Sequence, residues 1–193
     1  IHGKEYPSSH TTPDILSLNK MFSEAVEAGC EYAVMEVSSH GIHQNRIAGL
    51  KFEIGAFSNI SHDHLDYHKT FAEYIKAKKK FFDELPKNSI ALTNIDDKNG
   101  IVMLQNSPAK RYSYALKTDA DFKAKILENQ FTGMLLMLDG KEFWTPLIGL
   151  FNAYNLLAVY SIAKLLGFDQ EEILRHLSSL KNVDGRFQSI ITK

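Results

Sequence analysis

The sequence has few of the features that mark secreted, membrane or nucleic-acid-binding proteins. Its 193 residues include one cysteine, Cys30, which excludes an intrachain disulfide and fits a reducing compartment. No apolar run approaches the roughly 18 residues of a membrane span, and no signal peptide is visible. The formal net charge of −1 provides no basic field for nucleic acid. We therefore expect a cytoplasmic globular domain without a membrane span or a nucleic-acid partner.

The sequence also lacks an initial methionine and a common phosphate-binding motif. The chain starts at Ile1 rather than at methionine, so we expect a fragment of a longer protein. It also contains no G-x-x-x-x-G-K-[ST] loop, whose backbone amides cradle nucleotide phosphates. Without such a loop, nothing in the isolated chain preorganises phosphoryl transfer.

The residues that are present alternate short apolar runs with helical stretches. The runs expected to form strands in the first part of the chain span residues 32–37, 52–57, 89–94 and 111–115. This alternation predicts a mostly parallel sheet flanked by helices. Short turns then separate three runs that predict antiparallel hairpins, 122–128, 131–138 and 142–147. The sequence therefore predicts an α/β fold with an added antiparallel layer, closed by a helix over 151–166 and a second one capped by Asp169.

Capping residues predict where the other helices begin. Thr12 is the expected N-cap of the first helix, with Pro13 in its first turn and Gly29 at its end. The buried face expected for this helix consists of Ile15, Leu18, Phe22, Ala25 and Val26. Asp96 and Asp97 are expected to open a helix through about residue 104.

The densest group of reactive side chains follows the expected strand at 54–57. Residues 62–68, with the sequence His-Asp-His-Leu-Asp-Tyr-His, hold three histidines and two aspartates. Functional sites in α/β sheets lie at the carboxyl ends of strands, and this is such a position. A helix over 71–84 follows, and Thr70 with Glu73 forms its capping box.

One lysine of that helix lies where an apolar residue is expected. At about 100° per residue, Lys78 falls in the middle of the apolar stripe, whereas Lys76 and Lys80 point away from it. The stripe consists of Phe71, Tyr74, Ile75 and Phe82. Lys78 could snorkel to water, which is the more usual behaviour of lysine. It could instead be partly desolvated, which would lower its pKa and make the amine reactive.

These residues resemble the signature of the Mur ligase family, D-H-L-D-Y-H…Y…A-K-x-x-L-F. The signature matches residues 63–68, then Tyr74, then residues 77–82. The resemblance implies that His64 binds a metal ion. It also implies that Lys78 reacts with carbon dioxide to give a carbamate, whose two oxygens suit Mg²⁺. The histidines at 40, 62 and 68 receive no role, because a histidine in a polar turn is more often solvated than a ligand.

A second motif, Met-Glu-Val-Ser-Ser-His at residues 35–40, resembles the family's M-E-V-S-S-H. Taken alone, Glu36 could be a strand-end carboxylate that faces water. The resemblance implies instead that Glu36 helps to hold Mg²⁺. In the branch that adds the third residue of the peptidoglycan stem, it also implies contacts to a UDP-muramoyl dipeptide from Thr11, Thr12, Ser38, Gln44 and Arg46.

A third motif concerns the nucleotide. Residues 149–158 resemble G-x-F-N-x-x-N-x-L-A, in which Asn152 and Asn155 share a face of the first helical turn. Asn152 could also be a simple N-cap. The resemblance implies that both asparagines, together with Arg186, bind ATP. Gln188 stands where the family usually has glutamate.

The resemblance covers nearly the whole chain. It implies a P-loop-type central domain over 1–183 that lacks its first β-loop-α unit, with 184–193 as the start of a link to a C-terminal domain. The implied activity is ATP-dependent amide-bond formation with Mg²⁺ through an acyl phosphate, in the bacterial cytoplasm. The expected substrates are UDP-N-acetylmuramoyl-L-Ala-D-Glu and diaminopimelate, with L-lysine as the alternative amino acid. The isolated chain is expected to be inactive.

Two other functions remain open at this point. A ligase of the folylpolyglutamate synthase type would share the fold and the acyl-phosphate chemistry, and a non-catalytic binding module would explain the absent phosphate loop. A missing first unit would also leave the strands at 32–37 and 54–57 with unpaired edges. We expect these edges to be covered by N-terminal residues or by a second copy of the chain. Otherwise the site should be distorted, without bound Mg²⁺; in either case Lys78 should be an unmodified amine.

Overall fold

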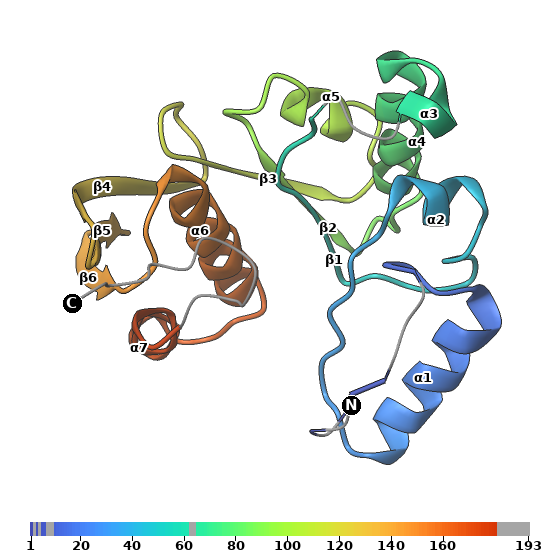
Figure 1. Ribbon diagram of the computed structural model, residues 1–193, viewed down its shortest axis with the longest axis horizontal. Helices are drawn as coiled ribbons and strands as arrows, with labels where there is room; N and C mark the ends of the chain where they lie inside the picture. The colour runs from blue at the N-terminus through green and yellow to red at the C-terminus, as the bar shows by residue number, and fades with distance from the viewer. Residues whose placement is uncertain (2, 4, 7–9, 62–64, 181–193) are drawn as a thin grey trace, which may run out of the picture.

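The fold is a six-stranded sheet with helices on both faces (Figure 1). The computed structural model describes residues 1, 3, 5–6, 10–61 and 65–180. The strands lie in sequence order and are β1 (Ile54–Phe57), β2 (Ile90–Asn94), β3 (Lys110–Ala115), β4 (Phe122–Gln130), β5 (Gly133–Leu138) and β6 (Lys141–Thr145). The helices are α1 (Ile15–Glu27), α2 (Ser39–His43), α3 (Leu65–His68), α4 (Phe71–Asp83), α5 (Gly100–Leu104), α6 (Leu150–Leu165) and α7 (Gln170–Ser178).

Strand β2 is buried on both faces, as the parallel-sheet prediction requires. It pairs in parallel with β1 and with β3, and β3 pairs in parallel with β4. Successive side chains of a strand point to opposite faces. Ala91 accordingly packs in a cluster with residues of α2, α4 and α5, whereas Leu92 packs in a second cluster with residues of α6 and α7. The carboxyl end of β2 therefore lies between two helical layers.

The antiparallel hairpins are confirmed, and they continue the same sheet. Strand β4 pairs with β5, and β5 pairs with β6, both antiparallel. The turn expected at 129–130 lies at 131–132 instead, because β4 extends to Gln130. Helices α6 and α7 cover this part of the sheet. None of the helices in the described ranges is long and apolar enough to cross a membrane.

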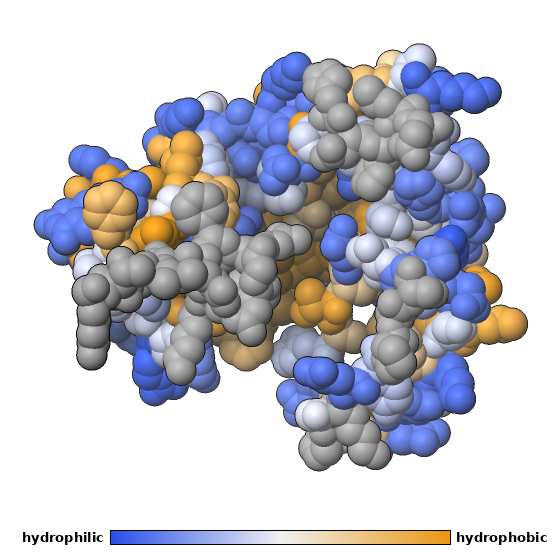
Figure 2. All heavy atoms as spheres, in the orientation of Figure 1, coloured by the Kyte–Doolittle hydropathy of each residue, from blue (hydrophilic) through white to orange (hydrophobic). Residues whose placement is uncertain are grey.

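The strand expected at residues 32–37 does not form. No residue before 54 in the described part of the chain belongs to a strand, so this apolar segment joins no β-ladder. Its side chains are correspondingly exposed, with Val34 at 99% and Tyr32 at 57%. Figure 2 shows apolar atoms in the hollow between the part that carries α1 and the part that carries α6 and α7. Strand β1 therefore has one unpaired edge, as expected, and no strand from the described N-terminal residues covers it.

Two helix starts also differ from the prediction. Asp14, rather than Thr12, is the N-cap of α1, because its carboxylate accepts hydrogen bonds from Leu16 N and Ser17 N. Of the buried face expected for α1, only Leu18 is buried, and Val26 is 73% exposed. Helix α5 begins at Gly100, because Asp96 and Asp97 bond to other segments instead of opening a helix.

Neighbouring leucines on β5 provide a matched test of this burial pattern. Leu136 is completely buried against Phe143, whereas Leu135 lies on the opposite face beside the half-exposed Trp144. Leu136→Ala should lower the free energy of unfolding by about 2–5 kcal/mol, because it leaves a cavity in the core. Leu135→Ala should lower it by at most about 1 kcal/mol. Urea unfolding of both variants checks this, and equal losses would contradict the assigned register.

Candidate functional site

Helix α4 holds the lysine of the first motif on its half-buried side. Thr70 is the N-cap, and its hydroxyl accepts a hydrogen bond from Glu73 N at 3.2 Å, as the capping-box motif predicts. Tyr74, Phe81 and Phe82 are the buried residues of the helix. Lys78 follows Tyr74 by one turn, and its Nζ lies 5.5 Å from the centroid of the Tyr74 ring. The helix therefore fixes this amine against an aromatic face.

Lys78 is partly desolvated rather than extended into water. Burial lowers the pKa of its amine, and the negative charge of Glu36 opposes this by raising the pKa. The structure thus shows a half-buried amine at Lys78, and its reactivity stays a prediction. Glu36, 42 residues earlier in the sequence, is therefore near enough for its charge to act on this amine.

The segment that contains Glu36 is held by one buried hydroxyl group instead of a β-ladder. Thr12 is 1% exposed, and its Oγ1 accepts a hydrogen bond from Ser38 N at 2.9 Å. The same oxygen lies 3.0 Å from the carbonyl oxygen of Glu36 and 3.0 Å from Ser38 Oγ. Gly41 lets Thr12 approach, because a Cβ at residue 41 would lie 2.7 Å from Thr12 Cγ2. Thr12 therefore acts from inside the fold, and Thr11 beside it is exposed.

Helix α2 begins at this same point and presents the next two candidate residues. Ser38 is its N-cap and accepts a hydrogen bond from Gly41 N at 3.1 Å. Beyond its end, Arg46 donates from Nε and Nη2 to Gln44 Oε1 at 2.9 and 2.6 Å, and from Nη1 to the Thr12 carbonyl at 2.7 Å. These bonds bring Thr12, Ser38, Gln44 and Arg46 into one connected group.

A tyrosine of the first motif joins this group, although the sequence interpretation gave it no role. Because the Gln44 oxygen faces Arg46, its amide nitrogen faces Tyr67 and donates to the phenol oxygen at 3.2 Å. This leaves the phenol proton for His43 Nδ1, which lies 2.9 Å away. His68, also without an assigned role, is buried with its Nε2 2.8 Å from Ser39 Oγ and stacks on Tyr74. The position of both residues inside the D-H-L-D-Y-H motif was the only available signal.

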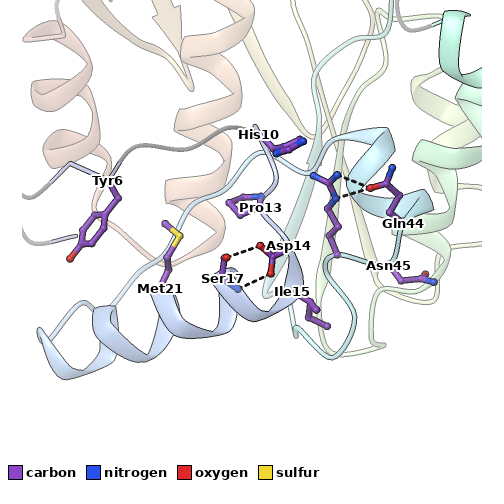
Figure 3. Close-up of a pocket in the computed structure, with 10 residues that line it drawn as sticks. Tyr6, His10, Pro13, Asp14, Ile15, Ser17, Met21, Gln44 and Asn45 are labelled. Atoms are coloured by element: carbon purple, nitrogen blue, oxygen red, sulfur yellow. Dashed lines mark hydrogen bonds between the residues drawn. The ribbon is translucent and has the colours of Figure 1, made fainter.

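A pocket of about 540 Å³ opens beside Gln44 and Arg46 (Figure 3). Its lining comes from the N-terminal segment, the start of α1 and the end of α2: Tyr6, His10, Pro13, Asp14, Ile15, Ser17, Met21, Gln44, Asn45 and Arg46. Arginine and amide side chains at its edge suit a carboxylate or phosphate group. The pocket thus lies next to the group that holds Glu36 in place.

The nucleotide candidates form a second group on the other face of the sheet. Helix α6 begins after Gly149, which is the N-cap with φ 90°, so Asn152 is not a capping residue. The Asn152 side chain donates to the Ile148 carbonyl at 2.8 Å, whereas Asn155 is exposed. His64 and Arg186, the remaining candidates, lie outside the described residues. Within the described ranges, no group of three His, Cys, Asp or Glu side chains is placed to hold a metal ion.

Comparisons with known proteins show the family to which the chain belongs. A family model described as the Mur ligase middle domain matches residues 1–163. The UDP-N-acetylmuramoyl-L-alanyl-D-glutamate--2,6-diaminopimelate ligase of Parabacteroides distasonis is 58% identical over 190 residues, which are 98% of this chain and 39% of that protein. The ligase of the same name from Cytophaga hutchinsonii is 56% identical over 192 residues, which are 100% of this chain and 40% of that protein.

A solved structure shows the same arrangement of elements. It is titled as a UDP-N-acetylmuramoyl-L-alanyl-D-glutamate--2,6-diaminopimelate ligase and is 31% identical, with a TM-score of 0.83. The match covers 97% of this chain and 40% of that one. The chain therefore spans about two fifths of the length of the relatives it matches.

The two neighbouring threonines provide a test of the hydroxyl that holds the Glu36 segment. Thr12→Val keeps the shape of the side chain but leaves Ser38 N without its acceptor, so it should lower the free energy of unfolding by about 1–3 kcal/mol. Thr11→Val, at an exposed position, should change it by less than about 0.5 kcal/mol. Thermal unfolding measures both effects, and hydrogen exchange of the Ser38 amide should accelerate only in Thr12→Val. An unchanged Ser38 amide in that variant would contradict this role of Thr12.

Proposed function

Because the chain belongs to the family of Mur ligase middle domains, we propose that it forms the reaction centre of an ATP-dependent ligase of peptidoglycan synthesis. The ligase would join an amino acid to UDP-N-acetylmuramoyl-L-Ala-D-Glu. The names of relatives more than 50% identical support this substrate and favour diaminopimelate over L-lysine as the amino acid. The structural observation that carries the proposal is the partly desolvated Lys78, which lies against the Tyr74 ring and is influenced by the charge of Glu36. Thr12 connects the Glu36 segment to Arg46 and Gln44.

The proposed reaction has two steps. A carboxylate of the D-glutamyl residue attacks the γ-phosphorus of ATP, which forms an acyl phosphate and releases ADP. The amine of the incoming amino acid then attacks the acyl carbon, and a tetrahedral intermediate collapses to an amide and inorganic phosphate. Both steps depend on holding anionic groups close together, so positioning and charge stabilisation supply most of the catalysis.

The dipeptide substrate is anionic, and the pocket beside α2 fits this character. Arg46 keeps a fixed orientation through its bonds to Gln44 and to the Thr12 carbonyl, so little side-chain entropy is lost when it binds a carboxylate or phosphate. Ser38 and Thr11 complete the set that we propose for this substrate. Thr12 contributes by holding Ser38, and its burial argues that it acts mainly in this way.

The described residues fit a magnesium ion in part. Glu36 offers exposed carboxylate oxygens, which are the ligands Mg²⁺ prefers. We propose that Lys78 adds two oxygens as a carbamate, formed when its neutral amine attacks carbon dioxide and loses a proton, and that His64 adds a nitrogen. The lowered pKa of Lys78 supports this, because more of the amine is neutral at a given pH. When bound, Mg²⁺ would neutralise charge on the phosphates.

We assign the nucleotide to the start of α6. Asn155 is exposed there and Asn152 lies one turn before it, so amide groups are available to read a nucleotide edge. Arg186 is proposed as a third contact to ATP. We further propose that residues 1–183 belong to this domain, that residues 184–193 begin a link, and that the ligase acts in the bacterial cytoplasm. Self-association through the open edge at β1 stays a prediction.

The isolated 193-residue chain should not hydrolyse ATP. It contains no phosphate-binding loop, so no set of backbone amides holds the β- and γ-phosphates. Phosphate release with Mg²⁺ should therefore equal the rate of a Lys78→Ala control in the same assay. Steady hydrolysis that Lys78→Ala abolishes would show that the chain assembles a working centre without such a loop.

The role of Lys78 is best tested in a full-length ligase. The matching region of the Parabacteroides distasonis enzyme can be replaced by this chain to give a chimeric ligase. Lys78→Ala should lower kcat by about 10²–10³-fold, the range for lost charge stabilisation, and short carboxylates should restore part of it. Lys76→Ala, on the exposed side of the same helix, should be nearly silent. Equal losses in both variants would mean that Lys78 has no special role.

The substrate can be tested separately. The chimeric ligase should release phosphate with UDP-N-acetylmuramoyl-L-Ala-D-Glu and diaminopimelate, and Arg46→Lys should raise KM for the dipeptide substrate because the planar fork is lost. Arg175→Lys, at an exposed position of α7 outside this pocket, serves as the matched control. Turnover of a folate with glutamate instead would place the chain with folylpolyglutamate synthases, and binding without turnover would favour a non-catalytic module.

A further inference from the structure

The loop that follows strand β2 lies between the two groups of candidate residues. It spans residues 95–97 and follows Asn94, the last residue of the strand whose faces carry the two hydrophobic clusters. Its polar side chains do not point into water. Asn94, Asp96 and Asp97 each form hydrogen bonds to segments that are distant in sequence.

Asp96 connects this loop to helix α6. Its Oδ2 accepts hydrogen bonds from Leu116 N at 2.8 Å, from Lys117 N at 2.9 Å and from the Tyr154 hydroxyl at 2.8 Å. Its Oδ1 accepts from Thr118 N at 2.9 Å and from Thr118 Oγ1 at 2.6 Å. One carboxylate therefore fixes the loop after β3 and the first turns of α6. Tyr154 lies between the two asparagines that we assign to ATP.

These bonds keep Asp96 charged and Tyr154 protonated under assay conditions. Burial opposes the charge of Asp96, but the bonds from Thr118, Tyr154 and the backbone amides outweigh it and hold its pKa well below the usual range. Burial and the bond to Asp96 raise the pKa of Tyr154 to about 12. Because the Asp96 pKa is lowered on folding, its stabilising effect is complete above about pH 3.9 and is lost only as the pH falls below that value.

The same loop also holds the segment that leads to His64. Asp97 Oδ2 accepts a hydrogen bond from Ile60 N at 3.1 Å, and its Oδ1 accepts from Asn99 N at 2.8 Å. Asn94 donates to the Ser58 carbonyl at 2.9 Å and accepts from Asp96 N at 3.0 Å. The path of the chain after β1 is therefore set by side chains of the neighbouring strand end.

We propose that Asp96 and Asp97 are positioning residues that set helix α6 and residues 58–61, the described segment after β1, relative to each other. The inference rests on the proposed function, because it takes the start of α6 as the ATP site and the segment after β1 as the metal site. Asp96 supports α6, and Asp97 supports the segment after β1. Loss of one of these side chains should therefore affect one site more than the other.

The test compares two single substitutions in the chimeric ligase. Asp96→Asn replaces one acceptor oxygen by an NH₂ group that faces N–H or O–H donors, so α6 should shift and KM for ATP should rise between about tenfold and a hundredfold. Asp97→Asn places an NH₂ group against Ile60 N or Asn99 N. It should lower kcat and raise the Mg²⁺ concentration for half-maximal activity, with a smaller change in KM for ATP. Tyr154→Phe removes a single bond to Asp96 and should raise KM for ATP in the same direction but by less.

Asp121→Asn is the matched control. Asp121 also accepts hydrogen bonds from a backbone amide and a hydroxyl, those of Ser113, but it lies in the exposed turn before β4. It should leave both KM for ATP and the Mg²⁺ dependence unchanged. Thermal unfolding of every variant separates folding from function, because a purely structural role would lower Tm without splitting the two kinetic effects. If Asp96→Asn does not fold, the KM for ATP of Tyr154→Phe decides whether the bond to Asp96 positions α6.

Asn155→Ala distinguishes failure of this inference from failure of the proposed function. If Asn155→Ala raises KM for ATP but Asp96→Asn and Tyr154→Phe do not, the positioning role of Asp96 is wrong. Parallel changes in ATP and Mg²⁺ dependence for Asp96→Asn and Asp97→Asn would also overturn the proposal. If Asn155→Ala leaves KM for ATP unchanged, the assignment of ATP to α6 is wrong, and the inference fails with it.

Discussion

The burial of strand β2 on both faces is the constraint from which the rest of the arrangement follows. Ala91 and Leu92 are both fully buried, yet they belong to different hydrophobic clusters. Helices must therefore cover both sides of the sheet, and the loops after the strands emerge between two helical layers. Polar side chains at the end of β2 reach the segment after β1 on one side and α6 on the other. The carboxyl edge of the sheet therefore connects α6 and the segment after β1 through hydrogen bonds of neighbouring side chains.

Charges near this edge are stabilised in different ways, and the differences suit different tasks. Asp96 accepts five hydrogen bonds, so its charge is fixed and it is suited to hold other segments. Lys78 is partly desolvated, and burial lowers the pKa of its amine although the charge of Glu36 opposes this, so its amine is suited to react. Arg46 donates hydrogen bonds to Gln44 and to the Thr12 carbonyl, which hold its guanidinium group in place. An arginine held in this way is preorganised to bind an anion.

Local features of the sequence predicted much of this fold and some of the site. The capping motif at Thr70 and the helical stripe around Lys78 depend on residues three or four apart, and both are confirmed. The hairpins of β4 to β6 depend on short turns and are also confirmed. The strand expected at 32–37 failed because strand formation needs a distant partner, which composition alone does not provide. Thr12 was misassigned because Asp14 competes for the same capping position two residues later.

Long-range hydrogen bonds could not be predicted from the sequence pattern. Asp96 and Tyr154 are separated by 58 positions, and Gln44 and Tyr67 by 23, so no periodicity links them. The sequence could mark Gln44 through a family motif but could not show that Tyr67 orients it. A resemblance transfers roles at matched positions, whereas supporting residues become visible only in the fold.

The claim on which the account most depends is that Lys78 is a reactive amine that becomes a metal-binding carbamate. The most direct measurement is ¹³C NMR of the chimeric ligase in labelled bicarbonate with Mg²⁺ and a non-hydrolysable ATP analogue. We expect a carbamate resonance that is present in Lys76→Ala and weakened in Glu36→Gln, and that disappears in Lys78→Ala. A fully active ligase without this resonance, or a resonance that persists in Lys78→Ala, would contradict the account.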